Sequence, residues 1–450
     1  MLSAAECATL RAEARRVLDR NRRRGVSIWA GRAFDFVCPS VAQYPFQWLW
    51  DSCFHAIALA RIDVARACRE LQGLLDAAAP SGFIPHIIFW EKERFLAALA
   101  RYNVVFGGSH TTATIQPPML AIALERVATA GAPADWVRRA IPPAVAYCRW
   151  LARERDPDGD GLIAILQPDE SGLDAAPQFD AALGMARPDE AALRQAMGRL
   201  FAAYAPHRGD DRRCLALDVF HVESVLVNVI WIESLRALTR LITRYGLPPA
   251  PAAAAEAGGH PAAAVPATPP ASAAPTADEL TALAERARTT LLERCYDAAT
   301  GAFYDLVGVA EEPSRVLTVS SLMPLYLPDL PPALAARLVR EHLTCPDRFW
   351  LPYPVPSVAA SEPSFEPDFG SGLVWRGPTW INTNWFLVHG LRHHGYAALA
   401  DELAERTASL ALRSGLRECY DPYTGAGYGA CDFGWSALVI DLLPETDDLP

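Results

Sequence analysis

The sequence lacks the short motifs that identify several common enzyme classes. No two of its ten cysteines are separated by just two residues, which argues against a zinc or thioredoxin-type centre. No H-E-x-x-H, P-loop or G-x-S-x-G pattern occurs either. The scattered cysteines are instead expected to be mostly small, buried residues on helices.

Positive charge is also in short supply. Lysine is scarce beside arginine, and 41 basic residues face 52 acidic ones, which gives a formal net charge of −11. Nucleic acids and anionic membranes both attract clustered lysine and arginine. The charge balance therefore argues against both as partners.

Long apolar runs are missing as well. No segment has the roughly 18 uninterrupted apolar residues that a membrane span requires. Residues 1–24 predict an amphipathic helix, with Leu10, Ala14, Val17 and Leu18 on one face, and they lack the apolar centre and cleavage site of a signal peptide. A reduced, cytoplasmic, soluble protein is the simplest expectation.

Helical periodicity dominates what is present, and half of the 450 residues are hydrophobic, enough for a sizeable core. Strand-like stretches are short and lie between helices, which favours an all-α architecture. Residues 293–301 closely resemble residues 418–425, and such repeated helix exits favour one closed toroid over separate domains. Helices are expected from about Ser52, after an Asp63 cap, and near 116–128, 134–154, 189–204, 219–245, 277–295, 332–343, 377–395, 397–413 and 435–443.

Two segments interrupt this pattern. Residues 80–114 are loop-like, and a loop of this length in a compact protein is usually functional. Residues 247–277 are almost entirely alanine and proline, and they cannot bury enough surface to offset the entropy lost on ordering. We expect a single domain, residues 1–450, with a disordered or loosely packed insertion at 247–277.

Two pairs of tryptophans are candidates for a sugar-binding wall. Trp48 and Trp50 precede Asp51 at the start of a helix, and Trp375 and Trp380 flank the turn Arg376-Gly377-Pro378. Aromatic faces stack on the C–H faces of sugar rings, while a carboxylate bridges neighbouring hydroxyls. Arg376 is able to form a fork of hydrogen bonds to a ligand or a carboxylate, and Gly377 allows close approach to the backbone. The alternative is ordinary packing at two helix starts, with Asp51 as an N-cap.

The segment Gln167–Asp174 is poorly suited to a core, because it places Asp169, Glu170 and Asp174 beside the turn Ser171-Gly172. Hydrolysis of a glycosidic bond needs one protonated carboxyl group and a second carboxylate, and the first must be kept protonated by burial or by nearby like charges. Asp174 and the distant Glu418 are the candidate pair. A solvated surface position is the alternative for any single carboxylate.

A further acidic turn precedes that segment. Asp156, Asp158 and Asp160, followed by Gly161, imitate the first half of an EF-hand loop, but Gln167 occupies the twelfth position, where a bidentate glutamate is required. A plain turn into a hairpin is the simpler interpretation. Whether this turn binds a cation stays open.

Taken together, these stretches resemble glycoside hydrolase family 63, in particular its bacterial branch of mannosylglycerate and glucosylglycerate hydrolases. The resemblance runs in one order through most of the chain, so it is specific as a set. The matching stretches are 44–52 (YPFQWLWDS), 82–86 (GFIPH), 116–118 (QPP), 170–174 (ESGLD), 375–380 (WRGPTW) and 418–425 (ECYDPYTG).

The resemblance implies an (α/α)6 barrel that hydrolyses a small α-glucoside or α-mannoside with inversion and without a cofactor or a catalytic metal. Asp174 falls on the general-acid position and Glu418 on the general-base position. Glu170 is expected beside the acid, as an orienting or pKa-raising neighbour. The positions expected to contact the sugar are Tyr44, Trp48, Trp50, Asp51, Gln116, Glu170, Gly172, Trp375, Arg376, Gly377 and Trp380.

The chain also departs from the family pattern near the expected sugar. Ala175 and Ala176 stand where the family often has Asn-Ser, Asp169 where it often has Trp, and Val374 where it commonly has an aromatic residue. A glycerate group would need a cationic anchor, for which Arg208, Arg212 and Arg213 are candidates by approximate location. The identity of the glycoside and the oligomeric state, including a homo-oligomer, stay open.

Three other functions compete with this interpretation. An exo-α-glucosidase acting on oligosaccharides or trehalose would need an open cleft with extra aromatic subsites, whereas glycerate glycosides would need a small pocket closed by residues 80–114 and floored by arginine. A sugar epimerase would typically use a pair of histidines, and no convincing pair is evident. A non-catalytic sugar-binding protein is the remaining alternative.

Overall fold

Six helical segments form a closed inner ring in the computed structural model, which describes residues 2–28, 30–91, 110–247 and 273–444. Each segment contacts the next one along the chain, and the last returns to the first. In order they are α2 (Leu49–Ala60), α5 (Leu120–Thr129), α9 (Val225–Tyr245), the 3-10 helix η5 (Val319–Tyr326), α12 (Ile381–His393) and the 3-10 helix η7 (Gly434–Asp441).

A second layer of helices surrounds this ring and packs against its segments. The outer members are α1 (Ala4–Arg20) on η7, α3 (Val64–Asp76) on α2, α6 (Ala134–Glu154) on α5 and α9, α10 (Ala273–Thr290) on α9, α11 (Pro332–Arg337) with its continuation η6 (Leu338–Leu343) on η5, and α13 (Ala397–Ser414) on α12. Six inner and six outer members within the described residues make an (α/α)6 barrel, as the family resemblance predicted.

The two layers follow from different hydrophobic patterns. In α9 every residue from Val225 to Leu235 is buried, as expected for a helix with neighbours on all sides. In α3 the burial is confined to one stripe that includes Ala67, Leu71 and Leu74, and Asp63 caps the helix by accepting a hydrogen bond from the backbone of Arg66. The amphipathic pattern therefore assigns α3 to the outer layer.

Short antiparallel hairpins connect the helices. Residues 293–301 and 418–425, which are similar in sequence, both follow an outer helix and both contribute to a two-stranded hairpin. The pairs are β1 (Arg22–Ser27) with β2 (Arg32–Val37), β3 (Gln47–Trp48) with β4 (Ile87–Ile88), β6 (Tyr296–Asp297) with β7 (Ala302–Phe303), and β10 (Arg417–Tyr420) with β11 (Gly427–Cys431), and a three-stranded sheet has the order β5 (Val222–Glu223), β8 (Leu306–Val307), β9 (Glu312–Pro313).

Several predicted boundaries are wrong. The expected helix 219–245 begins only at Val225, because residues 222–223 form β5. Helix α12 begins at Ile381, so Pro378 precedes the helix and does not occupy its first turn. The helix expected over residues 1–24 ends at Arg20, and the hairpin β1–β2 follows it. The acidic turn does not lead into a hairpin of its own, since its downstream strand is a single bridge between Ile165 and Val222.

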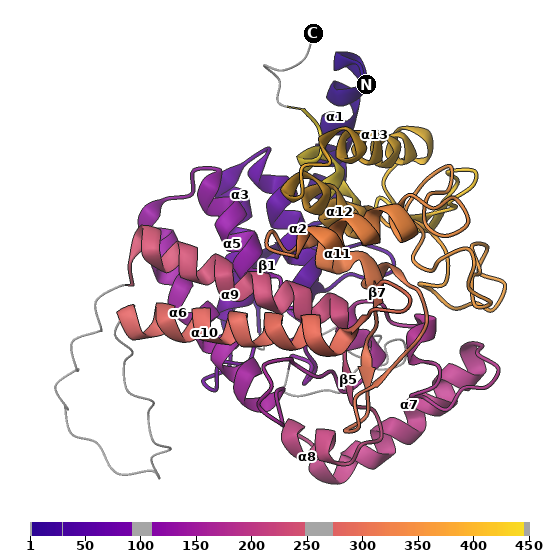
Figure 1. Ribbon diagram of the computed structural model, residues 1–450. Helices are drawn as coiled ribbons and strands as arrows, with labels where there is room; N and C mark the ends of the chain where they lie inside the picture. The colour runs from indigo at the N-terminus through magenta and orange to yellow at the C-terminus, as the bar shows by residue number, and fades with distance from the viewer. Residues whose placement is uncertain (1, 29, 92–109, 248–272, 445–450) are drawn as a thin grey trace, which may run out of the picture.

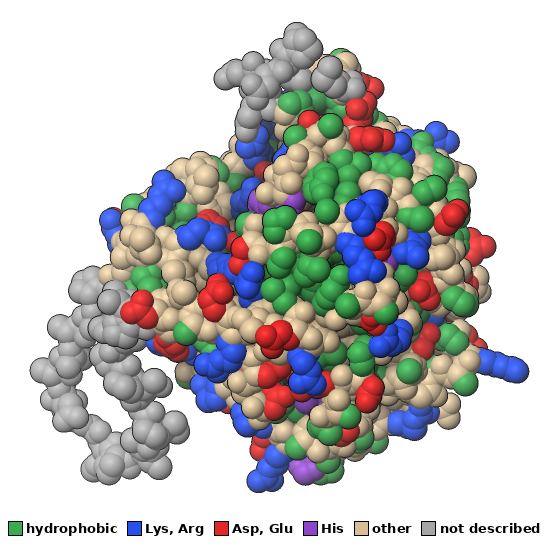
Figure 2. All heavy atoms as spheres, in the orientation of Figure 1, with side chains coloured by type: hydrophobic (Ala, Val, Ile, Leu, Met, Phe, Trp, Pro, Cys, Tyr) green, Lys and Arg blue, Asp and Glu red, His purple; other side chains and the backbone are tan. Residues whose placement is uncertain are grey.

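Two helices lie outside the ring at one end of the molecule (Figure 1). They are α7 (Glu190–Tyr204) and α8 (Asp211–Ala216), capped by the side chains of Asp189 and Asp210. On the face shown in Figure 2, acidic and basic side chains are interspersed, and neither sign forms a continuous patch.

The predicted Ala/Pro-rich insertion at 247–277 lies largely outside the described residues, although residues 273–277 belong to α10. Most of the predicted loop between 80 and 114 also lies outside them. Among the helices that the structure describes, none is long and apolar enough to cross a membrane.

Candidate active site

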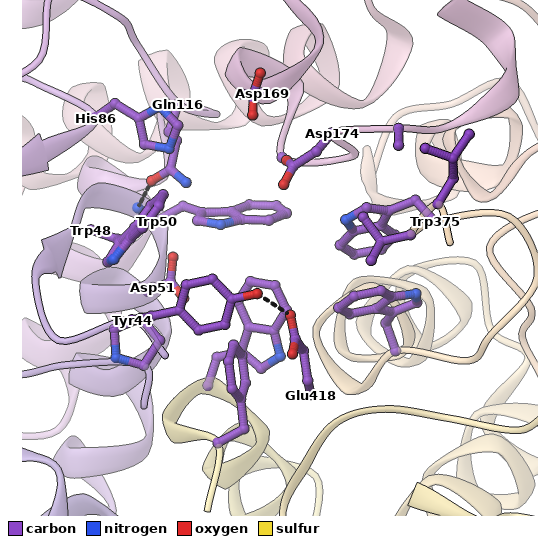
Figure 3. A pocket seen from close by; sticks show the side chains of 18 of the residues that line it. Tyr44, Trp48, Trp50, Asp51, His86, Gln116, Asp169, Asp174, Trp375 and Glu418 are labelled. Carbon is purple, nitrogen blue, oxygen red and sulfur yellow. Dashed lines mark hydrogen bonds between the residues drawn. The ribbon is translucent and has the colours of Figure 1, made fainter. Parts of the chain in front are cut away.

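A cavity of about 310 Å³ opens among the loops that join the ring helices, and it collects residues from many parts of the chain (Figure 3). Asp169 and Asp174 point into it from one side, and Glu418 points into it from the opposite side. Its lining includes Tyr44, Trp48, Trp50, Asp51, His86, Gln116, Gly172, Ala175, Trp375, Trp380, Phe433 and Trp435.

The first turn of α2 supplies one wall. Strand β3 pairs with β4, and the backbone N–H of Leu49 donates to the carbonyl of His86, which fixes the point where the helix begins. Trp48, not Asp51, occupies the N-cap position, so the carboxyl of Asp51 is released from capping and lines the cavity. The side chain of Gln116 accepts a hydrogen bond of 3.0 Å from the backbone of Trp50 and thereby ties α2 to the neighbouring loop.

Stacked indoles supply the other wall. The rings of Trp375 and Trp380 lie 3.6 Å apart and nearly parallel, and Trp435 meets Trp380 at 5.8 Å. Trp435 also contacts Trp50 edge to face at 5.5 Å, so the indoles of both walls touch. Trp375 has a φ of +64°, a sparsely populated conformation for a residue with a side chain. Apolar faces with this arrangement suit the C–H faces of a sugar.

Glu418 is held at a bulge between β10 and β11. The register of the two strands shifts between Arg417 and Cys419, and such bulges re-aim a side chain. Both oxygens of Glu418 act as acceptors: Tyr44 donates its hydroxyl at 2.9 Å, and the backbone of Ala430 donates at 2.8 Å. Gly429 leaves room for the carboxylate, because a Cβ there would lie 2.4 Å from a Glu418 oxygen. The bulge therefore fixes one carboxylate in the cavity.

Asp174 follows the short 3-10 helix η1 (Pro168–Ser171), which ends at Gly172. Gly172 has a φ of +74°, and a Cβ at this position would lie 2.5 Å from the ring of Trp50, so only glycine fits this turn. Burial, followed by the charge on Glu418, raises the pKa of Asp174 to about 7. Asp174 is therefore the carboxyl group that can hold a proton near neutral pH.

Two further carboxyl groups lie in the same cavity. Burial raises the pKa of Asp51 well above its ordinary value, and the charges of Asp174 and Glu418 raise it further. Burial and the charge on Asp174 also raise the pKa of Asp169. With Glu190, the cavity thus gathers five carboxyl groups, of which Glu418 carries the two hydrogen bonds described above.

Comparison with known proteins shows the family to which the chain belongs. Residues 44–436 match the family model described as the mannosylglycerate hydrolase MGH1-like glycoside hydrolase domain. The chain belongs to this family. The match identifies the protein as a glycoside hydrolase and excludes the epimerase and binding-protein alternatives. It also confirms the resemblance to glycoside hydrolase family 63.

Individual relatives cover nearly the whole chain. A mannosylglycerate hydrolase of Thermus thermophilus is 30% identical over 90% of this chain and 95% of its own length. The glucosylglycerate hydrolase of Mycolicibacterium hassiacum is 26% identical over 88% of this chain and 91% of its own length. The crystal structure of a family 63 mannosylglycerate hydrolase from Thermus thermophilus, in complex with Tris and D-glycerate, superposes with a TM-score of 0.79 at 30% identity and covers 96% of this chain and 99% of that chain.

Three predicted site residues of this glycoside hydrolase do not line the cavity. Glu170 is fully buried and forms a bidentate pair with Arg155 at 2.6 and 2.7 Å, so it braces the acid-bearing turn from behind. Arg376 pairs with Asp180 instead of a ligand. A Cβ on Gly377 would meet the backbone of residues 366–367 at 2.7 Å, so its lack of a side chain serves packing.

The proposed glycerate anchors also lie elsewhere. Arg208 lines a separate cavity, Arg212 donates to the carbonyl of Arg153, and Arg213 pairs with Asp210 on the surface. The arginine that does line the candidate active site is Arg194 on α7, which is exposed and lies 3.6 Å from Glu190.

Several lining residues were not among the sequence candidates. His86 was part of a matching motif without an assigned role, and Phe433 and Trp435 form an aromatic pair that the sequence could have revealed. The remaining ones carry no signal of their own: Pro39, Glu190, Leu193, Arg194, Gly372 and Leu373. Among the described residues, groups with metal-ligand spacing do not include any cavity residue.

Proposed function

We propose that the protein is an inverting α-glycosidase that hydrolyses the α-glucoside or α-mannoside of D-glycerate. The observation that carries the proposal is the opposition of Asp174 and Glu418 across an indole-walled cavity, with the pKa of Asp174 raised to about 7 (Figure 3). The names of the relatives, which act on mannosylglycerate and glucosylglycerate, supply the substrate class.

In this mechanism Asp174 is the general acid. Its proton passes to the glycosidic oxygen as the bond to the anomeric carbon breaks, so the glycerate leaves as a neutral alcohol at that oxygen. Burial of the carboxyl group keeps the proton available near neutral pH, because the charged form is disfavoured in a poorly solvated site.

Glu418 is the general base. It takes a proton from a water molecule, whose oxygen attacks the anomeric carbon from the face opposite to the leaving group, and the configuration inverts. The hydrogen bonds from Tyr44 and Ala430 fix the orientation of the carboxylate. After one turnover Glu418 holds the proton taken from water and Asp174 has lost its own, and exchange with solvent restores both groups.

The size of the cavity favours a small substrate. Its volume of about 310 Å³ lies at the lower end of the range of about 300–1,000 Å³ for ligand pockets. Asp51 and Gln116 supply polar groups along one wall, and the indoles supply the stacking surface. Arg194 at the rim is the cationic side chain that would meet a glycerate carboxylate.

Two measurements test the proposal. A panel of glucosylglycerate, mannosylglycerate, trehalose and maltose should show turnover of a glycerate glycoside at least about tenfold above that of the disaccharides. Proton NMR of freshly released sugar should show the β-anomer first. Release of the α-anomer first would contradict inversion, and faster cleavage of trehalose or maltose would favour an exo-α-glucosidase.

A further inference from the structure

A second group of carboxylates lies outside the candidate active site, where three distant segments meet. Asp160 belongs to the turn after α6, Glu223 to strand β5, and Glu311 to the turn between β8 and β9. One oxygen from each of these side chains lies within 4.8 Å of the other two. Like charges this close repel each other, so the arrangement needs a compensating positive charge.

The positive charge that the described residues supply is small. Arg294 pairs with Glu311 at 2.5 Å but is half exposed. The ring of His221 lies 3.9 Å from Glu223, beyond hydrogen-bonding distance. One arginine therefore faces three carboxylates.

Glu223 is the decisive member of the group. Its side chain is only 1% exposed, and neither of its oxygens accepts a hydrogen bond from any residue that the structure describes. One oxygen of Asp160 is buried without a hydrogen bond in the same way. A buried carboxylate without a partner is costly, and buried charges in proteins are normally paired or coordinate a metal.

The neighbouring turn extends this group. Asp156, Asp158 and Asp160 also place their oxygens within 4.8 Å of one another, in the spacing of the first three ligands of an EF-hand loop. That loop lacks the bidentate glutamate at its twelfth position, where Gln167 stands. Glu223, from a strand more than sixty residues further along the chain, brings a glutamate to the group in its place.

We propose that one calcium ion binds between Asp160, Glu223 and Glu311, with Asp156 and Asp158 completing the anionic shell. Oxygen ligands at about 2.3–2.6 Å from a calcium ion lie at most about 5 Å apart, and every pair within each group of three meets this limit. A shell made only of carboxylates favours a hard cation over zinc or copper, which prefer nitrogen and sulfur ligands.

The ion would act through structure and not through the chemistry of hydrolysis, so this proposal does not depend on the proposed substrate. Residues 162–166 lead from Asp160 to the turn that carries Asp174, and Ile165 bonds to Val222, the neighbour of Glu223, at 2.8 Å. The hydroxyl of Thr290 also donates to the backbone of Asp160. A bound cation would therefore fasten the start of the acid-bearing segment to β5 and to the β8–β9 turn.

The test uses the full-length protein after treatment with a chelator. Titration calorimetry with calcium chloride should show one equivalent bound, and saturating calcium should raise Tm by roughly 2 °C or more, because the ion binds only the folded state. Glu223→Gln should abolish both effects. In the presence of chelator this variant should melt at or above the parent temperature, since it no longer buries an unpartnered charge.

Glu293→Gln is the matched control, because Glu293 is an exposed glutamate next to Arg294 and is outside the group. It should retain the calcium effect in full. Absence of calcium binding by the parent, or calcium binding by Glu223→Gln with unchanged affinity, would overturn the proposal. If Glu223→Gln does not fold, Glu311→Gln serves the same comparison, and tighter binding of magnesium than of calcium would overturn the choice of ion.

Discussion

Residues 162–166 connect two groups of buried carboxylates, and the two groups differ in their surroundings. In the cavity, Asp174 lies among indoles, and Glu418 accepts two hydrogen bonds. In the second group, Glu223 accepts none from the described residues. The first group can relieve its repulsion by keeping a proton on Asp174. The second has oxygens turned toward one another, an arrangement that suits a cation. In the roles that we propose, the same residue type serves proton transfer in one place and ion binding in the other.

Substitution of the two central cavity carboxylates should give the largest effect. Asp174→Asn and Glu418→Gln each remove one proton-transfer step, and general acid–base catalysis contributes about 10²- to 10⁴-fold. Steady-state turnover of the best glycerate glycoside should fall by that factor in each variant. Calcium binding should be unchanged in both variants. Glu223→Gln should instead lose calcium binding and keep its turnover. Full turnover in either cavity variant would refute the assigned roles.

Two glycine-to-alanine substitutions compare the turn before Asp174 with the acidic turn that contains Asp158 and Asp160. Gly172 and Gly159 both have positive φ, but a Cβ at Gly172 would meet Trp50 at 2.5 Å, while a Cβ at Gly159 would meet nothing within 4 Å. Both alanine variants should lose about 1 kcal/mol of stability from backbone strain. Gly172→Ala should also lose turnover by about tenfold or more, because even a displacement of about 1 Å near the reacting groups is costly.

Gly159→Ala serves as the control for that comparison, with turnover expected within about twofold of the parent. Chemical denaturation would give the stability changes, and steady-state kinetics the turnover. Equal loss of turnover in both variants would show that the acid-bearing turn responds to strain anywhere in the acidic region and not to the contact with Trp50.

Loss of the hydrogen bond to Glu418 should have a smaller effect than loss of the Glu418 carboxylate itself. Tyr44→Phe removes the hydroxyl that donates to Glu418 at 2.9 Å and leaves the ring packing intact. Hydrogen bonds to charged groups contribute about 1.5–3 kcal/mol, so turnover should fall by roughly 10- to 100-fold with little change in KM. Tyr423→Phe, at a half-exposed position outside the cavity, is the control. A change confined to KM would place Tyr44 in sugar binding alone.

Local patterns in the sequence were enough to predict every segment of the two layers except η5, because hydrophobic periodicity reports directly on which face is buried. The sequence candidates also included four tryptophans, Asp174 and Glu418, and all six of these residues line the cavity. The sequence predicted that Glu170 and Arg376 contact the sugar, whereas both form ion pairs within the protein. Local sequence does not distinguish these two cases, because a charged side chain that pairs with a distant residue has the same neighbours in the chain as one that binds a ligand. Their partners, Arg155 and Asp180, are assigned by tertiary packing alone.

The same limit explains the other misses. Arg194 lies on α7, an amphipathic helix outside the ring, and nothing in its sequence indicates that one side chain reaches the cavity rim. The meeting of Asp160 with Glu223 depends on the bridge between Ile165 and Val222, a contact between distant segments. Even the boundary of α12 after Pro378 follows from the extended segment that pairs Thr379 with Tyr420.

The smallest expected effect is on the pH dependence of the melting temperature, which reports whether Asp174 is protonated in the folded protein. Burial and the charge on Glu418 raise its pKa from 3.8 to about 7. Between these pH values the folded protein holds a proton that the unfolded chain has released, so the free energy of unfolding falls as the pH rises. Asp174→Asn cannot lose that proton. Its Tm relative to the parent should therefore be higher at about pH 8 than at about pH 5, by roughly a few degrees.

Turnover by the parent should decline above about pH 7, since the general acid is then ionised. A Tm difference independent of pH would show that Asp174 is already charged in the folded protein below neutral pH, and it would then be no better suited to donate a proton than Glu418.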